Sequence, residues 1–423
     1  MSTTILIYNQ NDMKIGSTPE FYTGAPVDPV DLRFRGAFVA NLWRTLRSGH
    51  VVLAAPRRTG KTSVMDYLRD HPENGFRVVS INVQDLTHPA DFFQVLLDAF
   101  HDAHPEFVRD RLAEGWGLVS GVLDRVESIG AGGFKLAIRG SDPDWRTNWR
   151  RHGDTFLAQA RNAGDPILFI IDEFPDMLIN LAREDKGLLR EFLAWFRTQR
   201  QNPAPTRDSI RWLVGGSVNL AGTLDALGLV DLINDLEDVS LPPLTEEHIE
   251  TFVADMLGGR SVPFDADVPR RLIARLGRPI PFFMQIATRD LYRRWKRGQR
   301  RIAATDVDAV FNEMIVGSAA RTQLQHYYSR IRQYYAEPKR SIAHALLGQI
   351  SVSESGLRRE TLLHETERAL ADLCATLPAH QRRQLFNQLM FDLENDFYIV
   401  EVEGGTCDFA SGVLKSWWRK YHA

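Results

Sequence analysis

Residues 51–63 of this 423-residue chain have the types and spacing that bind phosphate groups. An apolar run, Val51 to Ala55, predicts a buried strand, and a turn of small and basic residues follows it. Gly60-Lys61-Thr62-Ser63 then leads into a predicted helix over residues 63–69. Backbone N–H groups of such a turn, together with the positive end of the helix, bind anionic phosphate oxygens. This order of strand, turn and helix is typical of a Walker A motif.

Each residue type in this stretch has a separate role. Gly60 allows the backbone to approach a phosphate closely, and Lys61 places a positive charge on the β- and γ-phosphates. The hydroxyl of Thr62 is a ligand suited to Mg²⁺. The first position of the motif holds Ala55 in place of glycine, a mild departure because that position demands less of the backbone. The predicted nucleotide-binding residues are Ala55, Pro56, Arg57, Arg58, Thr59, Gly60, Lys61, Thr62 and Ser63.

A second stretch, residues 166–174, ends in two acids. Five consecutive apolar residues, Ile167 to Ile171, predict a strand buried on both faces, as in a parallel sheet. Asp172 at its end is suited to complete the Mg²⁺ shell, and Glu173 to orient and activate the attacking water. An apolar strand that ends in Asp-Glu is a moderate signal alone, but after a Walker A motif it indicates a Walker B motif. The sequence therefore predicts ATP and Mg²⁺ as cofactors and an ATPase reaction.

Three further polar residues are candidates for sensing the nucleotide. Ser217 and Asn219 lie at the polar end of the strand predicted over 212–219, where a polar side chain can sense the γ-phosphate and align water. A plain turn after the strand explains either residue equally well. Arg278, between Gly277 and Pro279, is placed to reach the nucleotide phosphates from a helical lid. The alternative is a helix-breaking turn with a solvated arginine.

The elements that must position these residues alternate along the chain. Strands are predicted at 51–55, 76–83, 167–172 and 212–219, with helices at 37–47, 63–69, 89–100, 145–162 and 184–201. This alternation predicts an α/β fold, a P-loop NTPase core with a parallel doubly wound sheet. Ligands of such sheets bind at the carboxyl ends of the strands, where both motifs end.

The predicted domains follow changes of composition. An N-terminal arm covers 1–35, the P-loop core 36–240, a helical lid 241–318 and a winged-helix domain 319–423. An insertion at about 101–150 contains a predicted helix over 107–126, a Gly-rich break and a short strand over 134–138. The winged-helix domain is predicted because helices at 320–335, 338–349 and 379–394 precede a hairpin over 397–410.

Composition narrows the class of protein. The net charge of −3 gives no global attraction to nucleic acid, so such a site must be local. Residues 270–301 carry eleven Lys and Arg against one acid, Asp290, a local charge of +10. Such a run binds nucleic acid, forms a solvated face or contacts a protein. Two cysteines, no evident signal peptide and no apolar run near the ~20 residues that span a bilayer predict a cytoplasmic protein.

Together these motifs resemble a known group. Residues 55–63, 170–174, 216–217 and 277–279 are similar to the archaeal-type P-loop ATPases of the AAA+ and STAND group, which carry a C-terminal winged helix. Origin-recognition-type replication initiators share this plan. The resemblance implies ATP binding with Mg²⁺, a lid that closes on nucleotide and a switch that acts on the winged helix. Many bacterial members of this group serve in mobile elements or in defence, which is a tendency of the group only.

One feature departs from this group. AAA+ rings place an arginine finger near the last core strand, but residues 232–239 contain no arginine. Arg190, Arg197 or Arg200 is a substitute, or Arg58 acts in cis. A slow switch or a monomer therefore fits as well as a hydrolysing ring.

Three functions remain open at this point. The first is an ATP-hydrolysing switch that couples nucleotide state to the winged helix. The second is an origin-recognition-like initiator or loader that binds double-stranded DNA. The 379–394 helix would then read the DNA groove, or the 270–301 stretch would bind the phosphates. The third is a nucleotide-locked scaffold for a partner protein, such as an effector of a defence or mobile-element system. A homo-oligomer is also open, and no membrane partner is predicted. The residues suited to the DNA groove are Gln381, Arg382, Arg383, Gln384 and Asn387.

Overall fold

The computed structural model describes most of the chain. The described residues are 20–22, 24, 26–55, 57–105, 143–162, 165–201, 210–216, 220–225, 227–277, 279–373, 377–402 and 404–423. They form two compact units. Of the described residues, the first unit comprises Asp28–Arg57 and Lys61–Leu241, and the second comprises those between 20 and 27, Arg58–Gly60 and Pro242–Ala423.

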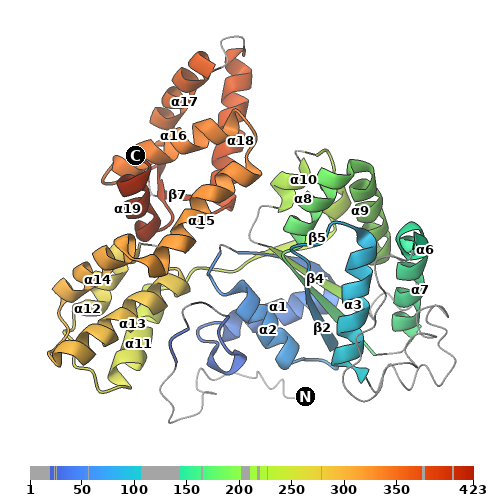
Figure 1. Cartoon of the computed structure of the whole chain (residues 1–423), viewed down its shortest axis with the longest axis horizontal. Helices are drawn as coiled ribbons and strands as arrows, with labels where there is room; N and C mark the ends of the chain where they lie inside the picture. Colours follow the sequence, from blue (N-terminus) through green and yellow to red (C-terminus); the bar gives the residue numbers. More distant parts are fainter. Residues whose placement is uncertain are drawn as a thin grey trace, which may run out of the picture. The chain divides into compact units, whose positions relative to one another are not determined.

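A five-stranded sheet is the centre of the first unit (Figure 1). Its strands are β1 (His50–Ala54), β2 (Arg77–Asn82), β3 (Ile167–Asp172), β4 (Ile210–Gly216) and β5 (Leu236–Ser240). Their order is β2-β3-β4-β1-β5, and every neighbouring pair is parallel. This confirms the predicted parallel α/β core.

Helices cover both faces of this sheet (Figure 1). One face packs against α1 (Gly36–Ser48) and α2 (Lys61–Asp70). The other packs against α3 (Pro89–Ala103), α7 (Trp149–Asn162), α8 (Phe174–Glu184), α9 (Lys186–Gln201) and α10 (Leu220–Asp225). Leu168 lies in the first core and Phe169 in the second, because successive side chains of a strand point to opposite faces. All six residues of β3 are buried, which explains its unbroken apolar run.

The structure differs from the prediction in several local features. The helix predicted over 145–162 is two helices, α6 (Pro143–Thr147) and α7, with Asn148 between them. Two 3-10 helices, Pro29–Asp31 and Val230–Ile233, had no clear periodic signal because each is only one turn long. The helix and strand predicted within the 101–150 insertion, at 107–126 and 134–138, lie outside the described residues.

The second unit begins with a group of helices. They are α11 (Glu246–Val253), α12 (Val268–Leu276), α13 (Pro281–Gly298) and α14 (Ala304–Val316), with a π-helical turn at Ala254–Gly258. Thr245 caps α11, since its side chain accepts a hydrogen bond from the His248 N–H. Most of the described residues between 246 and 316 are thus helical. That they form a separate lid domain stays a prediction.

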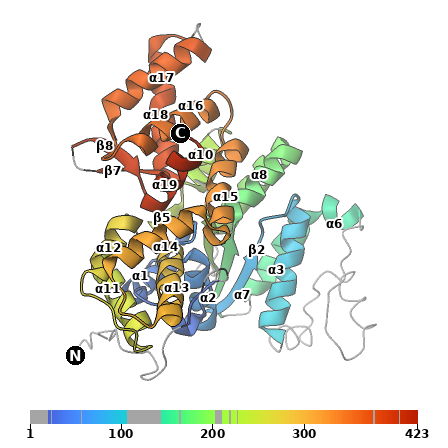
Figure 2. The ribbon, with the colours of Figure 1, turned by 60° about the vertical axis from the view of Figure 1, so that its left-hand side comes forward.

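The rest of the second unit combines helices with a small antiparallel sheet (Figure 2). Its helices are α15 (Ser318–Tyr334), α16 (Lys339–Val352), α17 (Arg359–Leu373), α18 (Ala379–Asn395) and α19 (Gly412–Tyr421). Its strands, in the order β6-β8-β7, are β6 (Leu357–Arg358), β7 (Ile399–Val402) and β8 (Thr406–Phe409). The β7–β8 hairpin lies where the sequence predicted one, and the two-residue β6 is an addition. None of the helices in the described part of the chain combines the length and apolar character that crossing a bilayer requires.

Candidate functional site

Lys61 and Asp172 meet in the first unit, although 111 residues separate them. The Lys61 ammonium contacts Oδ1 of Asp172, and the Thr62 hydroxyl donates to Asp172 Oδ2 at 2.9 Å. Lys61 begins α2 after the turn that follows β1, and Asp172 ends β3. Because β1 and β3 run parallel in one sheet, their carboxyl ends lie at the same edge.

The site is buried and has an excess of negative charge. Lys61 is 6% and Asp172 5% exposed. Glu173 Oε1 lies 3.9 Å from Lys61 Nζ, and the carboxylate of Asp176 on α8 also attracts the Lys61 ammonium. Burial lowers the pKa of Lys61, while Glu173 and Asp176 act against this shift. The guanidinium of Arg57 also acts on this ammonium, so three carboxylates outnumber two cations here. The oxygen donors of Asp172 and Thr62 fit a hard cation such as Mg²⁺.

The turn before Lys61 has the backbone that phosphate binding requires. Gly60 has a φ of +96°, and a Cβ added there would meet no atom within 4 Å, so its outer side is open. Ala55, Thr59 and Ser63 are buried and anchor the two ends of the stretch. A left-handed residue beside the N-terminus of the ten-residue helix α2 therefore leaves space for an anion.

Arg58 occupies the middle of this turn and belongs to the second unit. Its φ is +67°, which is uncommon outside glycine. Its guanidinium donates to the Gly24 carbonyl at 2.9 Å and lies 4.7 Å from the ring centre of Phe282, at the start of α13. In this structure Arg58 is thus engaged by the N-terminal stretch and α13.

Glu173 joins β3 to α8 in a left-handed conformation. Its φ is +58°, and its N–H donates to Asp172 Oδ1 at 2.9 Å. A left-handed non-glycine residue costs about 1–3 kcal/mol and persists where surrounding contacts require it. The turn places two acids on consecutive residues at the edge of the sheet.

Sequence reasoning missed two contributions to this site. Gly215 and Gly216 end β4, and a Cβ on Gly215 would lie 2.1 Å from Met65 and 3.4 Å from Lys61 Cδ. A Cβ on Gly216 would lie 2.3 Å from the ring of Pro175. The glycine pair therefore makes room for the Lys61 stem and for the turn after Glu173. Asp176 was also missed, although an acid four residues after Asp172 is visible in the sequence.

Four predicted site residues lie outside the described part of the chain. They are Pro56, Ser217, Asn219 and Arg278. Ser217 follows Gly216 directly, and Arg278 follows Gly277 at the end of α12. Their roles stay predictions.

The candidate arginine fingers differ in how they are engaged. Arg200 is buried and forms a two-pronged ion pair with Asp235, both contacts at 2.8 Å, so it is held inside its own unit. Arg197 donates to the Asp231 carbonyl at 2.6 Å. Arg190, in α9, is exposed. Of these three, Arg190 has the accessibility that a contribution to a neighbouring molecule needs.

Internal acids neutralise much of the basic stretch at 270–301. Seven of its arginines form ion pairs, namely Arg271, Arg275, Arg289, Arg293, Arg294, Arg300 and Arg301. Asp306 and Asp308, both on α14, accept four of these contacts. The local charge of +10 in the sequence is therefore much smaller on the folded surface.

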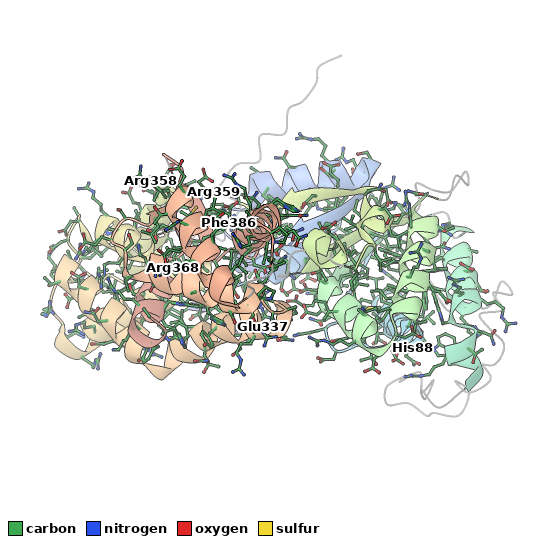
Figure 3. The ribbon with its side chains drawn as sticks, turned by 90° about the horizontal axis from the view of Figure 1, so that it is seen from above. His88, Glu337, Arg358, Arg359, Arg368 and Phe386 are labelled. Atoms are coloured by element: carbon green, nitrogen blue, oxygen red, sulfur yellow. The ribbon has the colours of Figure 1, made fainter. Side chains whose placement is uncertain are left out.

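A second cluster of possible metal ligands lies between α18 and the hairpin. Glu394, Glu401 and Cys407 place ligand atoms within 4.8 Å of one another. Arg359 lies 3.3 Å from Glu394 and 3.7 Å from Glu401, and its guanidinium also covers the ring of Phe386 (Figure 3). Burial raises the pKa of the Cys407 thiol to about 11. A guanidinium and a protonated thiol make this cluster structural.

Solved structures show which fold this is. The chain is similar to a Walker-type ATPase of Pyrococcus abyssi, with a TM-score of 0.62 and 14% identity over 94% of this chain and 99% of that one. It is also similar to the ORC2 protein of Aeropyrum pernix in ADPNP–ADP complexes, with a TM-score of 0.52 and 12% identity over 92% of both chains. No family model matches the sequence, and no curated protein matches it significantly.

Proposed function

We propose that this chain, which has the architecture of ORC-like P-loop ATPases, binds ATP with Mg²⁺ and hydrolyses it slowly as a molecular switch. The observation that carries the proposal is the contact of Lys61 and Thr62 with Asp172 at the edge of the sheet. A phosphate-binding lysine and a metal-binding acid from distant parts of the chain have little reason to meet in the interior otherwise, because burying charge is costly.

The residues divide the chemistry among them. Lys61 and the N–H groups of residues 59–63 hold the β- and γ-phosphates, and Thr62 and Asp172 hold Mg²⁺. When bound, Mg²⁺ neutralises charge on the phosphates. Glu173 orients a water for in-line attack on the γ-phosphorus and accepts its proton. Lys61 must leave Asp172 to reach a phosphate, so nucleotide and metal binding are coupled.

Calorimetry of the full chain with ATP, with and without Mg²⁺, tests this proposal. We expect ATP to bind, and Mg²⁺ to tighten binding because it replaces Lys61 as the counter-ion of Asp172. Thr62→Val should lose most of the tightening by Mg²⁺ but retain metal-free binding. Thr198→Val is the matched control, since Thr198 is an exposed threonine of α9. Absence of binding heat for ATP in the wild type would rule the proposal out.

A second candidate function is double-stranded DNA binding through α18. The exposed residues of this helix are Ala379, His380, Gln381, Arg383, Gln384, Asn387, Gln388 and Phe391. Residues 379–391 contain no acid. Amide side chains pair with adenine edges and arginine with guanine edges, so this face suits the major groove better than the ion-paired 270–301 stretch does. The helices and hairpin around α18 support the winged-helix interpretation.

Fluorescence anisotropy on duplex DNA at several salt concentrations separates these surfaces. Asn387→Ala should weaken binding to a preferred sequence by about 5–150-fold, as expected for one base contact. Arg297→Ala, in the basic stretch, should leave affinity nearly unchanged. The reverse ranking would assign binding to the basic stretch, and absence of binding at low salt with and without ATP would leave a partner protein as the target of the C-terminal part.

A further inference from the structure

The end of α12 and the beginning of α19 touch backbone to backbone. Gly277, which ends α12, and Ser411, which caps α19, form an isolated antiparallel bridge. Gly277 has a φ of +66°, a conformation that favours glycine. The two residues are 134 positions apart in sequence, yet both belong to the second unit.

A second glycine makes this approach possible. A Cβ on Gly412 would lie 2.5 Å from the Arg275 carbonyl oxygen and 3.3 Å from the Leu276 carbonyl. A Cβ on Gly277 would lie 3.0 Å from the Gly412 nitrogen. These neighbours are backbone atoms, which cannot rotate away as a side chain can. We call Gly277, Ser411 and Gly412 the glycine junction.

The packing around the glycine junction is continuous. α19 packs against both α12 and α14, and its apolar residues are buried. The negative end of α12 meets the positive end of α19, which is electrostatically favourable. Arg275 ties α12 to α14, since it lies 3.3 Å from Asp308 and 4.1 Å from the ring centre of Phe311. The elements on either side of the junction are thus held from several directions.

We infer that the glycine junction makes residues 242–318 and 319–423 one mechanical body, so that the end of α12 and the β7–β8 hairpin move together. Residues 278–279 follow Gly277 directly, and β8 ends two residues before Ser411. One backbone bridge therefore joins the end of α12 to the residues that follow β8. A helical lid that moved independently of the C-terminal part would have to break this bridge.

This inference has two parts. The mechanical part is independent of the proposed function, whereas the nucleotide-dependent part rests on it. If nucleotide binding displaces α12, that displacement passes through the glycine junction to the hairpin. By linkage, a ligand on the hairpin or α18 would change nucleotide affinity by the same factor. The mechanical part stands without any nucleotide.

Hydrogen exchange of the full chain without nucleotide tests the mechanical part. Gly412→Ala should accelerate exchange about tenfold both in 268–277 and in 406–414, because the backbones must separate. Gly36→Ala is the matched control, since Gly36 is also the first residue of a helix and an added Cβ meets nothing within 4 Å. Alanine improves helix propensity at both positions, so acceleration at Gly412 reports the lost contact.

A second variant approaches the junction from the other side. Leu276→Ala trims a buried side chain at the end of α12, and it should accelerate exchange in 406–414 as well as in 268–277. Acceleration confined to the segment that carries the substitution, in either variant, would overturn the inference. This variant also serves if Gly412→Ala does not fold.

The same measurement with ATP and Mg²⁺ tests the nucleotide-dependent part. In the wild type, exchange in the hairpin should change on binding, and in Gly412→Ala nucleotide should bind with little change in the hairpin. An equal hairpin response in both proteins, or none in the nucleotide-bound wild type, would overturn the coupling. If the wild type bound no nucleotide, the proposed function would fall, while the nucleotide-free experiment would still decide whether the junction joins the two parts.

Discussion

Glu173→Gln should reduce ATP turnover by about 10²–10⁴-fold, the usual contribution of a general base, while ATP stays bound. Glutamine keeps the shape of the side chain and removes the carboxylate that accepts the proton of the attacking water. Glu173 is suited to this role because its side chain is 15% exposed, whereas Asp172 is enclosed by Lys61, Thr62 and the Glu173 N–H. Phosphate release at saturating ATP measures turnover, and calorimetry measures binding.

Glu184→Gln is the matched control for this variant. Glu184 ends α8, the helix that Glu173 begins, and it is exposed. Its replacement should leave both turnover and affinity unchanged. If Glu173→Gln hydrolysed ATP at the wild-type rate, the base would lie elsewhere, and Asp176, which also acts on Lys61, would be the next candidate.

The sequence was sufficient for the parts of the fold that depend on local pattern. The unbroken apolar run at 167–171 predicted a strand buried on both faces because only a central parallel strand needs such a run. The same reasoning predicted that Asp172 lies at the edge where β1 ends, since parallel strands share that edge. The meeting of Lys61 and Asp172 follows from topology, which periodicity and motif order together predict.

Features that depend on tertiary contacts could not be predicted from the sequence. In the sequence, Gly215 and Gly216 look like an ordinary strand end. Only glycine fits at these positions because a Cβ would collide with Met65 or Pro175, which belong to other elements. The basic stretch read as a charged surface because its partners on α14 follow it in the chain. The contact between Gly277 and Gly412 could not be predicted, since a contact between residues 135 positions apart leaves no periodic pattern in the sequence.

Lys61→Met should abolish nucleotide binding and destabilise the nucleotide-free protein by about 3–5 kcal/mol, the usual cost of removing one partner of a buried ion pair. Methionine fills a similar volume, so the loss comes from charge. Without the ammonium, Asp172 loses its counter-ion while Glu173 and Asp176 remain close by. Chemical denaturation without nucleotide measures this loss.

The double variant Lys61→Met/Asp172→Asn separates charge from packing. Removing both members of the pair leaves no buried carboxylate at position 172, so most of the lost stability should return, and a double-mutant cycle gives the coupling energy. Nucleotide binding should not return, because the phosphates still lack Lys61. Wild-type stability in the single variant would mean that the pair contributes nothing to the resting fold. Recovery of stability without recovery of binding would establish that the same ammonium serves Asp172 in the empty protein and the phosphates in the bound one.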